Sequence, residues 1–84
     1  MKKHYVYILK SLHFPKQSYV GLTSNLSKRL AEHNRGKSWH TSKFRPWIIE
    51  AAFWFANYRT AIMFERYLKS GSGTAFRNKH IHST

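Results

Sequence analysis

The chain contains no cysteine, and this absence limits what a sequence of 84 residues can fold into. Chains of this length bury only a small core, and many depend on disulfides or bound metal for stability. Here packed side chains must hold the fold, and a hydrophobic content of 42% is enough for one core. We therefore expect a single domain over residues 1–84, without thiol chemistry, iron–sulfur clusters or cysteine-bound zinc.

Charge is the second strong constraint. Fifteen Lys and Arg stand against three Glu and no Asp, which gives a formal net charge of +12. Such a balance predicts a polyanionic partner. Because Glu32, Glu50 and Glu65 are the only acidic side chains, the sequence disfavours a two-metal nuclease site and paired-carboxylate glycosidase chemistry.

The hydrophobic residues do not form a membrane segment. The longest apolar stretch, near residues 51–56, is much shorter than the ~20 residues of a membrane-spanning helix. The basic start Met1-Lys2-Lys3 is followed by a strand-like segment and not by the apolar core of a signal peptide. We expect a cytoplasmic protein with no membrane partner and no small-molecule cofactor.

Three segments are predicted to be strands. Residues 4–10 are rich in β-branched and aromatic side chains, with Tyr5, Tyr7 and Leu9 on one face and Val6 and Ile8 on the other. Residues 18–22 follow a loop that contains a proline and predict the second strand of a hairpin. Residues 47–55 predict a third strand that begins after a proline.

Three helices are expected between and after these strands. Candidate N-caps at residues 23–25 and a glycine at position 36 bound a helix over 25–35. Residues 58–69 have helical spacing, and Gly71-Ser72-Gly73 is expected to end that helix before a short basic one over 74–81. The order β-β-α-β-α-α predicts an α+β fold, a small three-stranded antiparallel sheet flanked by helices.

Basic side chains concentrate between positions 28 and 45. This surface could follow a phosphate backbone, although a run of charge is usually a solvated face; the scarcity of acid favours contact with a polyanion. The predicted nucleic-acid-binding residues are Lys28, Arg35, Lys37, His40, Lys43 and Arg45, and Arg29 lies among them.

Single residues also suggest chemistry, each with a simpler alternative. Arg29 and His33 are four apart and share one helix face, where they could meet a phosphate or be ordinary surface residues. Glu65 lies beside the apolar stripe of its helix, where it needs a cation. That cation could be an arginine in a structural ion pair or a divalent metal completed by water and phosphate.

Tyr7 and Tyr19 lie on the two predicted hairpin strands, where partners come within contact. Tyrosines there usually pack, but a phenol can act as a general base when cations lower its pKa. His33, His40, His80 and His82 match no zinc-binding spacing. The three tryptophans are assigned to the core, not to base stacking.

Together these residues resemble the GIY-YIG nuclease domain in order and spacing. Tyr5-Val6-Tyr7 and Tyr19-Val20-Gly21 correspond to the two tripeptides of the family. The likeness extends over nearly the whole chain, and the segments 45–47 and 68–71 are similar to stand-alone bacterial members related to the nuclease subunit of excision repair. Two departures are Tyr5, in place of the first glycine, and Leu22, where repair-type members have lysine.

The resemblance implies a metal-dependent DNA endonuclease that hydrolyses phosphodiester bonds with one Mg²⁺ or Mn²⁺. Tyr19 would position or activate the attacking water with support from Tyr7, Arg29 would stabilise charge on the phosphate, and His33 would relay a proton or hold the tyrosine. Glu65 would be the only carboxylate that binds the metal. His40, Asn78 and Lys79 match positions with secondary roles in some members.

Other functions stay open at this stage. A non-catalytic nucleic-acid-binding module could have the same fold and basic face, and nothing in the residues separates a DNA substrate from RNA. Since family nucleases often obtain specificity from an attached domain, we also expect that a partner protein could supply it.

Overall fold

The computed structural model describes residues 3–82; the ends of the predicted domain, residues 1–2 and 83–84, lie outside the described residues. Its sheet contains β1 (His4–Ser11), β2 (Ser18–Thr23) and β3 (Trp47–Phe55). The order is β2-β1-β3, and β1 pairs antiparallel with both neighbours. The predicted α+β fold with a three-stranded antiparallel sheet is confirmed.

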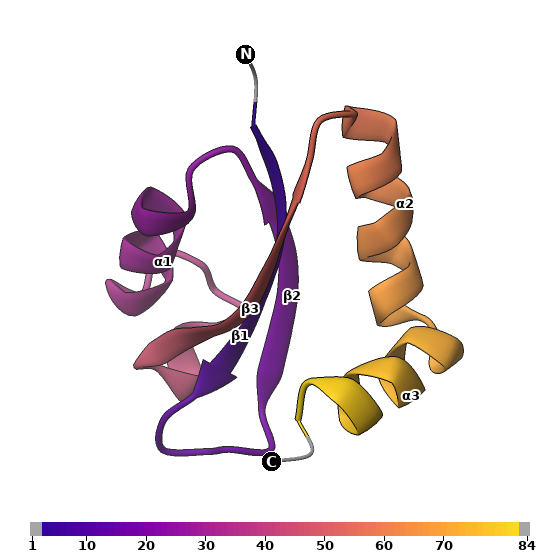
Figure 1. Cartoon of the computed structure of the whole chain (residues 1–84). Coiled ribbons are helices and arrows are strands. Elements are labelled where there is room, and N and C mark those ends of the chain that lie inside the picture. The colour runs from indigo at the N-terminus through magenta and orange to yellow at the C-terminus, as the bar shows by residue number, and fades with distance from the viewer. Residues whose placement is uncertain (1–2, 83–84) are drawn as a thin grey trace.

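Helices cover both faces of this sheet (Figure 1). The first helix, α1 (Leu26–Asn34), lies on one face, whereas α2 (Tyr58–Lys69) and α3 (Gly71–His80) lie on the other. A 3-10 turn over Ser42–Phe44 interrupts the connection from α1 to β3. None of the helices in residues 3–82 is long and apolar enough to cross a membrane.

The alternation predicted for β1 divides the core into two halves. Val6 and Ile8 pack toward α2 and α3 with Val20, Ala61 and Leu68. Tyr7 and Leu9 pack toward α1 with Trp47. Because both faces of β1 are covered, residues 6–9 are all buried, and the central strand is a continuous buried run.

Asparagine side chains begin the first two helices. Asn25 accepts a hydrogen bond from the Lys28 N–H, and Asn57 accepts one from the Thr60 N–H, as N-caps do. The third helix corrects the sequence prediction, because it starts at Gly71 and not at residue 74. Ser70 causes the early start: its N–H closes α2 on Tyr67, and its side chain caps Gly73 of α3.

Candidate active site

The centre of the α1 side is Tyr7, whose side chain is only 2% exposed. Its hydroxyl lies 3.0 Å from Nε2 of His33 on α1. His33 is completely buried, so the interpretation of this histidine as an ordinary surface residue is wrong. The phenol and the imidazole are thus a buried pair of titratable groups that join the central strand to α1.

The second nitrogen of His33 fixes its tautomer. Nδ1 lies 2.7 Å from Oγ1 of Thr41, and the Thr41 hydroxyl donates in turn to the carbonyl of Ser38. With the Thr41 hydroxyl directed at the Ser38 carbonyl, 3.5 Å away, the network assigns Nδ1–H as the donor to Thr41 and Nε2 as the acceptor from the Tyr7 hydroxyl. Burial lowers the pKa of His33, and the Arg29 charge lowers it further, which favours this neutral imidazole.

The loop that carries Thr41 is anchored at both ends. Asn34 donates to the carbonyl of Trp47 and accepts from its N–H, at 3.0 and 2.6 Å. The Trp47 indole N–H donates to the Thr41 carbonyl at 2.8 Å. After α1, Gly36 adopts a φ of 77° and bonds back to the carbonyl of His33, as in a Schellman motif. These contacts hold the histidine and the threonine in register.

Gly21 makes room for the phenol. It is the β2 partner of Tyr7, and a Cβ built on it would overlap the Tyr7 hydroxyl and ring. The glycine of the second tripeptide is therefore required by close approach of a side chain, and its backbone has no positive φ.

Tyr19 lies diagonally across the hairpin from Tyr7, since its own partner is Leu9. The ring of Tyr19 is 6.2 Å from that of Tyr7 and 5.0 Å from that of His33, measured between centroids. Unlike Tyr7, it is only half-buried. The two phenols and the imidazole form one cluster, of which Tyr19 is the accessible phenol.

Arg29 lies at the edge of this cluster, with its side chain 36% exposed. Burial raises the pKa of Tyr7, and the adjacent Arg29 guanidinium opposes that shift. Arg29 also donates to Glu32 at 3.0 Å, and this contact lowers the pKa of Glu32. A hollow of about 300 Å³ beside the two is lined also by Thr23, Ser24, Asn25 and Lys28.

Glu65 lies on α2, which covers the opposite face of the sheet from α1, and its charge makes a minor contribution to the raised pKa of Tyr7. Its side chain is 21% exposed, and Oε2 accepts from Lys69 at 3.0 Å. The structural alternative for Glu65, an ion pair with arginine, is not what the described residues show: Arg29 pairs with Glu32. The contact with Lys69 is a helix-surface pair of the weak kind.

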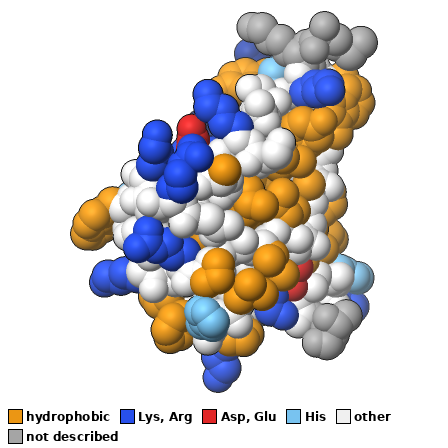
Figure 2. Space-filling model, turned by 90° about the vertical axis from the view of Figure 1, so that its left-hand side faces the viewer, with side chains coloured by type: hydrophobic (Ala, Val, Ile, Leu, Met, Phe, Trp, Pro, Cys, Tyr) orange, Lys and Arg blue, Asp and Glu red, His pale blue; other side chains and the backbone are white. Residues whose placement is uncertain are grey.

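The predicted nucleic-acid-binding residues lie on the same side as this cluster. In Figure 2, which looks onto the α1 side, several Lys and Arg side chains gather around an acidic patch at the upper left. All six predicted residues are exposed, and they lie on α1 or in the connection to β3: Lys28, Arg35, Lys37, His40, Lys43 and Arg45.

Other predicted residues lie elsewhere. Asn78 lines a pocket with Arg77 on the opposite face of the sheet, and Lys79 is exposed on the same helix. Of the tryptophans, only Trp47 is in the core; Trp39 is 80% exposed and Trp54 50%. Within residues 3–82 no group of three or more His, Asp or Glu side chains could hold a metal ion.

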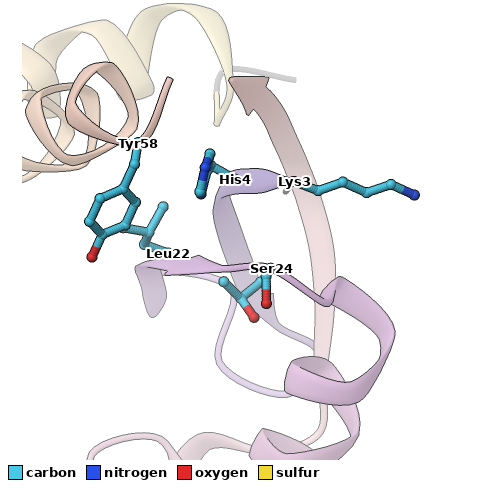
Figure 3. A pocket seen from close by; sticks show the side chains of 6 residues that line it. Lys3, His4, Leu22, Ser24 and Tyr58 are labelled. Atoms are coloured by element: carbon cyan, nitrogen blue, oxygen red, sulfur yellow. The ribbon is translucent and has the colours of Figure 1, made fainter. Parts of the chain in front are cut away.

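A further pocket of about 420 Å³ opens at the end of β2 that leads into α1. Figure 3 shows Leu22 beside the Tyr58 ring, with Lys3 extending away from them. His4 contacts Tyr58 at 5.1 Å between ring centroids. Leu22, the departure from repair-type members, packs against the apolar cluster on the α2 side of the sheet and lines this pocket.

The fold and the cluster together define an α+β domain with a buried, hydrogen-bonded tyrosine–histidine pair beside a basic surface. The model of the GIY-YIG catalytic domain matches residues 3–79, and the chain belongs to this family. The family resemblance in the sequence is thereby confirmed.

Relatives of two kinds are similar to the chain. The structure-specific endonuclease subunit SLX1 of Debaryomyces hansenii is 35% identical over 85 residues, which cover 93% of this chain and 23% of the relative. SLX1 of Candida dubliniensis is 33% identical, with 93% and 28% covered. The chain thus spans about a quarter of the length of these relatives.

The second kind is small. The UPF0213 protein SH2523 of Staphylococcus haemolyticus is 36% identical, with 86% of this chain and 87% of the relative covered. Among solved structures, the solution NMR structure of the UPF0213 protein BH0048 of Bacillus halodurans is similar, with a TM-score of 0.53 and 27% identity. The match covers 88% of this chain and 80% of that one.

Sequence reasoning missed Thr41, Asn34 and Glu32. One signal for the buried cluster was available, because Leu26, Leu30 and His33 follow the i, i+4, i+7 spacing of an apolar stripe. Thr41 and Asn34 gave no comparable signal, since their partners lie far along the chain or depend on a loop path.

Proposed function

We propose that this domain is a metal-dependent endonuclease that hydrolyses phosphodiester bonds in DNA. The observation that carries the proposal is the cluster of two phenols, an imidazole and a guanidinium beside an exposed basic surface, with a carboxylate on α2 whose charge acts on one of the phenols. Their sources are Tyr7 on β1, Tyr19 on β2, Arg29 and His33 on α1, and Glu65 on α2.

In this proposal Tyr19 positions the attacking water, because it is the accessible phenol of the cluster. Tyr7, the buried phenol of the cluster, supports Tyr19. In the free protein Tyr7 keeps its proton, since burial raises its pKa. If Tyr7 gives up its proton during the reaction, the proton can pass from the Tyr7 hydroxyl to Nε2 of the neutral His33 along their hydrogen bond.

Arg29 binds and stabilises the reacting phosphate. Its current partner is Glu32, and a phosphate oxygen can replace that carboxylate because both accept the same forked donors. A fixed cation beside a phosphate stabilises the charge that develops in the transition state.

Glu65 is the residue that would hold a divalent ion. The donor set fits Mg²⁺ or Mn²⁺ only if water and phosphate oxygens complete it, since one carboxylate lies at this place and Lys69 occupies one of its oxygens. A bound ion would act as a Lewis acid toward the phosphate and the leaving group. Lys69 would then release the carboxylate, at a small cost for an exposed pair.

The SLX1 relatives are named as subunits of structure-specific endonucleases. By analogy we include branched or nicked DNA among the substrates of this chain, and a partner protein as a source of specificity. A role in DNA repair would follow from such substrates.

The test is nicking of supercoiled plasmid with Mg²⁺ or Mn²⁺ and with an EDTA control. We expect Glu65→Gln and Tyr19→Phe to lower the rate at least about 100-fold, the scale of losing a catalytic group. Glu50→Gln and Tyr67→Phe are the matched controls, because they change the same groups outside the cluster.

Intact plasmid and intact branched DNA with every divalent ion, together with salt-sensitive retardation on a gel, would instead identify a non-catalytic nucleic-acid-binding module. Equal cleavage by the unaltered protein and by Glu65→Gln would contradict the assigned role of Glu65.

A further inference from the structure

On the face of the sheet opposite α1, Arg77 of α3 is a partly buried cation whose hydrogen-bond partners within residues 3–82 are neutral groups. Its Nε donates to the carbonyl of Leu68 at 3.0 Å, one terminal nitrogen donates to Ser18 Oγ at 3.1 Å, and the other to Thr74 Oγ1 at 3.3 Å. These bonds fix the plane of the guanidinium.

No carboxylate side chain compensates this charge. The chain has three, and each has another partner: Glu32 pairs with Arg29, Glu65 with Lys69, and Glu50 lies 2.7 Å from Nδ1 of His82. Among residues 3–82 this partly desolvated cation has no counter-charge, which is unfavourable, and burial accordingly lowers the pKa of Arg77. A bound anion would remove that penalty.

Space for an anion is present. A pocket of about 440 Å³ is lined by Arg77 with Pro15, Lys16, Ser18, Thr74, Asn78 and His82. Its charged groups are Arg77 and Lys16, with His82 engaged at 2.7 Å by Glu50. A guanidinium has five N–H donors, so three bonds to protein oxygens leave donors for a ligand, and the Asn78 amide adds a neutral one.

The pocket is adjacent to the candidate active site through two neighbours in the chain. Ser18, which accepts from Arg77, precedes Tyr19 on the edge strand β2, and the two side chains point to opposite faces. Leu68, whose carbonyl accepts from Arg77, is three residues from Glu65 on α2, which is less than one helical turn.

We propose that this pocket binds a phosphodiester group of the nucleic acid backbone that flanks the group at Tyr19 and Glu65. The anion site stands on the contacts of Arg77, and its assignment to DNA rests on the proposed nuclease function. A strand that passes around the exposed edge of β2 would place one phosphate on each face of that edge. Asn78, a predicted secondary residue, then acts in positioning this strand.

The test measures the affinity of the whole chain for a short fluorescein-labelled DNA duplex by anisotropy in EDTA, at several salt concentrations. We expect Lys16→Gln and Arg77→Gln each to weaken binding about three- to tenfold and to reduce the salt slope by about one. Arg66→Gln, an equal charge change on the exposed side of α2, should weaken binding less than about twofold. Thermal melts identify any loss of fold in Arg77→Gln, and Lys16→Gln leaves the bonds of Arg77 intact.

A second arm separates DNA phosphate from free phosphate. Inorganic phosphate is titrated while the NMR signals of Arg77 Nε–H and the Asn78 amide are followed. If these signals move but Lys16→Gln binds DNA like Arg66→Gln, the pocket takes small anions and its assignment to the DNA backbone is wrong. If neither the signals nor the DNA affinities change, there is no anion site. If the unaltered protein cleaves no DNA but Lys16→Gln and Arg77→Gln still bind DNA more weakly than Arg66→Gln, the nuclease function is contradicted and the phosphate site is supported.

Discussion

The central strand β1 contributes side chains to both faces of the sheet, but the two faces bury different kinds of groups. The face toward α2 and α3 is an apolar cluster of Val6, Ile8, Val20, Ala61 and Leu68. The face toward α1 buries Tyr7, His33 and Thr41 in a hydrogen-bonded chain. The first arrangement stabilises through burial alone. The second is stable only while every polar partner is satisfied, which is the condition under which a fold can hold reactive groups in place.

The largest effect on stability is expected on the apolar face. Leu68 is fully buried between α2 and the sheet, so Leu68→Ala should lower the free energy of unfolding by about 2–5 kcal/mol. Chemical denaturation measures this loss, and the rate of plasmid nicking per folded molecule should stay within about twofold, because the residue contacts none of the cluster. A loss below about 1 kcal/mol would show that this face is not the main source of stability.

A substitution on the α1 face should cost less stability but should also lower activity. Gly21→Ala places a methyl group against the Tyr7 hydroxyl, and overpacking of this kind costs about 1–3 kcal/mol. Because the displaced phenol also loses His33, we expect nicking to fall together with stability. Gly71→Ala is the matched control: a Cβ there meets nothing within 4 Å, so its stability should be unchanged or slightly higher.

Local sequence patterns predicted most of the fold but not the role of Gly21. The alternation in β1, the N-cap Asn25 and the glycine at position 36 that bound α1, and the span of α2 all follow from local patterns and agree with the structure. The tripeptides identified the family but not the reason for Gly21, which depends on the register of β1 with β2. The family motifs therefore carried more information about the site than the periodicity did.

The remaining parts of the site depend on contacts distant in sequence. The spacing of Arg29 and His33 left open whether the histidine meets a phosphate or is an ordinary surface residue, although its spacing from Leu30 places it on the buried stripe. Its partner Thr41 is fixed by the loop that Asn34 and Trp47 anchor, and loop paths have no period from which to predict them. The start of α3 was missed because Gly71-Ser72-Gly73 reads as a break, whereas Ser70 alone supplies both caps.

Low pH should destabilise the α1 face in particular, since the buried histidine, His33, lies there. The folded pKa of His33 lies below its unfolded value of 6.5 through burial, then the charge of Arg29, with Glu32 opposing. The unfolded chain therefore binds the proton first, and stability falls as the pH drops below about 6.5 until it passes the folded pKa. Each unit by which the pKa is lowered corresponds to about 1.4 kcal/mol.

The comparison protein is His33→Gln, which cannot titrate at this position. Urea unfolding at pH 7.5 and 5 should show a smaller acid loss in this variant, while the other five histidines contribute equally to both proteins. An NMR titration of the imidazole gives its pKa directly. A His33 pKa above 6.5, or equal acid losses in the two proteins, would contradict a fold that favours the neutral imidazole as acceptor for Tyr7.

The smallest effect concerns the edge of the α1 face, where Glu32 competes with phosphate for Arg29. The Arg29 guanidinium is the main cause of the lowered pKa of Glu32, so the two are paired at neutral pH. Glu32→Gln should release Arg29 and raise the affinity for a DNA duplex by about two- to fivefold at low salt, since exposed pairs are weak. Glu50→Gln removes the same charge away from Arg29, beside His82 of the α3 pocket, and shows how much affinity follows from losing a charge elsewhere. An equal gain in both variants would show that the gain comes from the overall field, and that Arg29 is not held in reserve by Glu32.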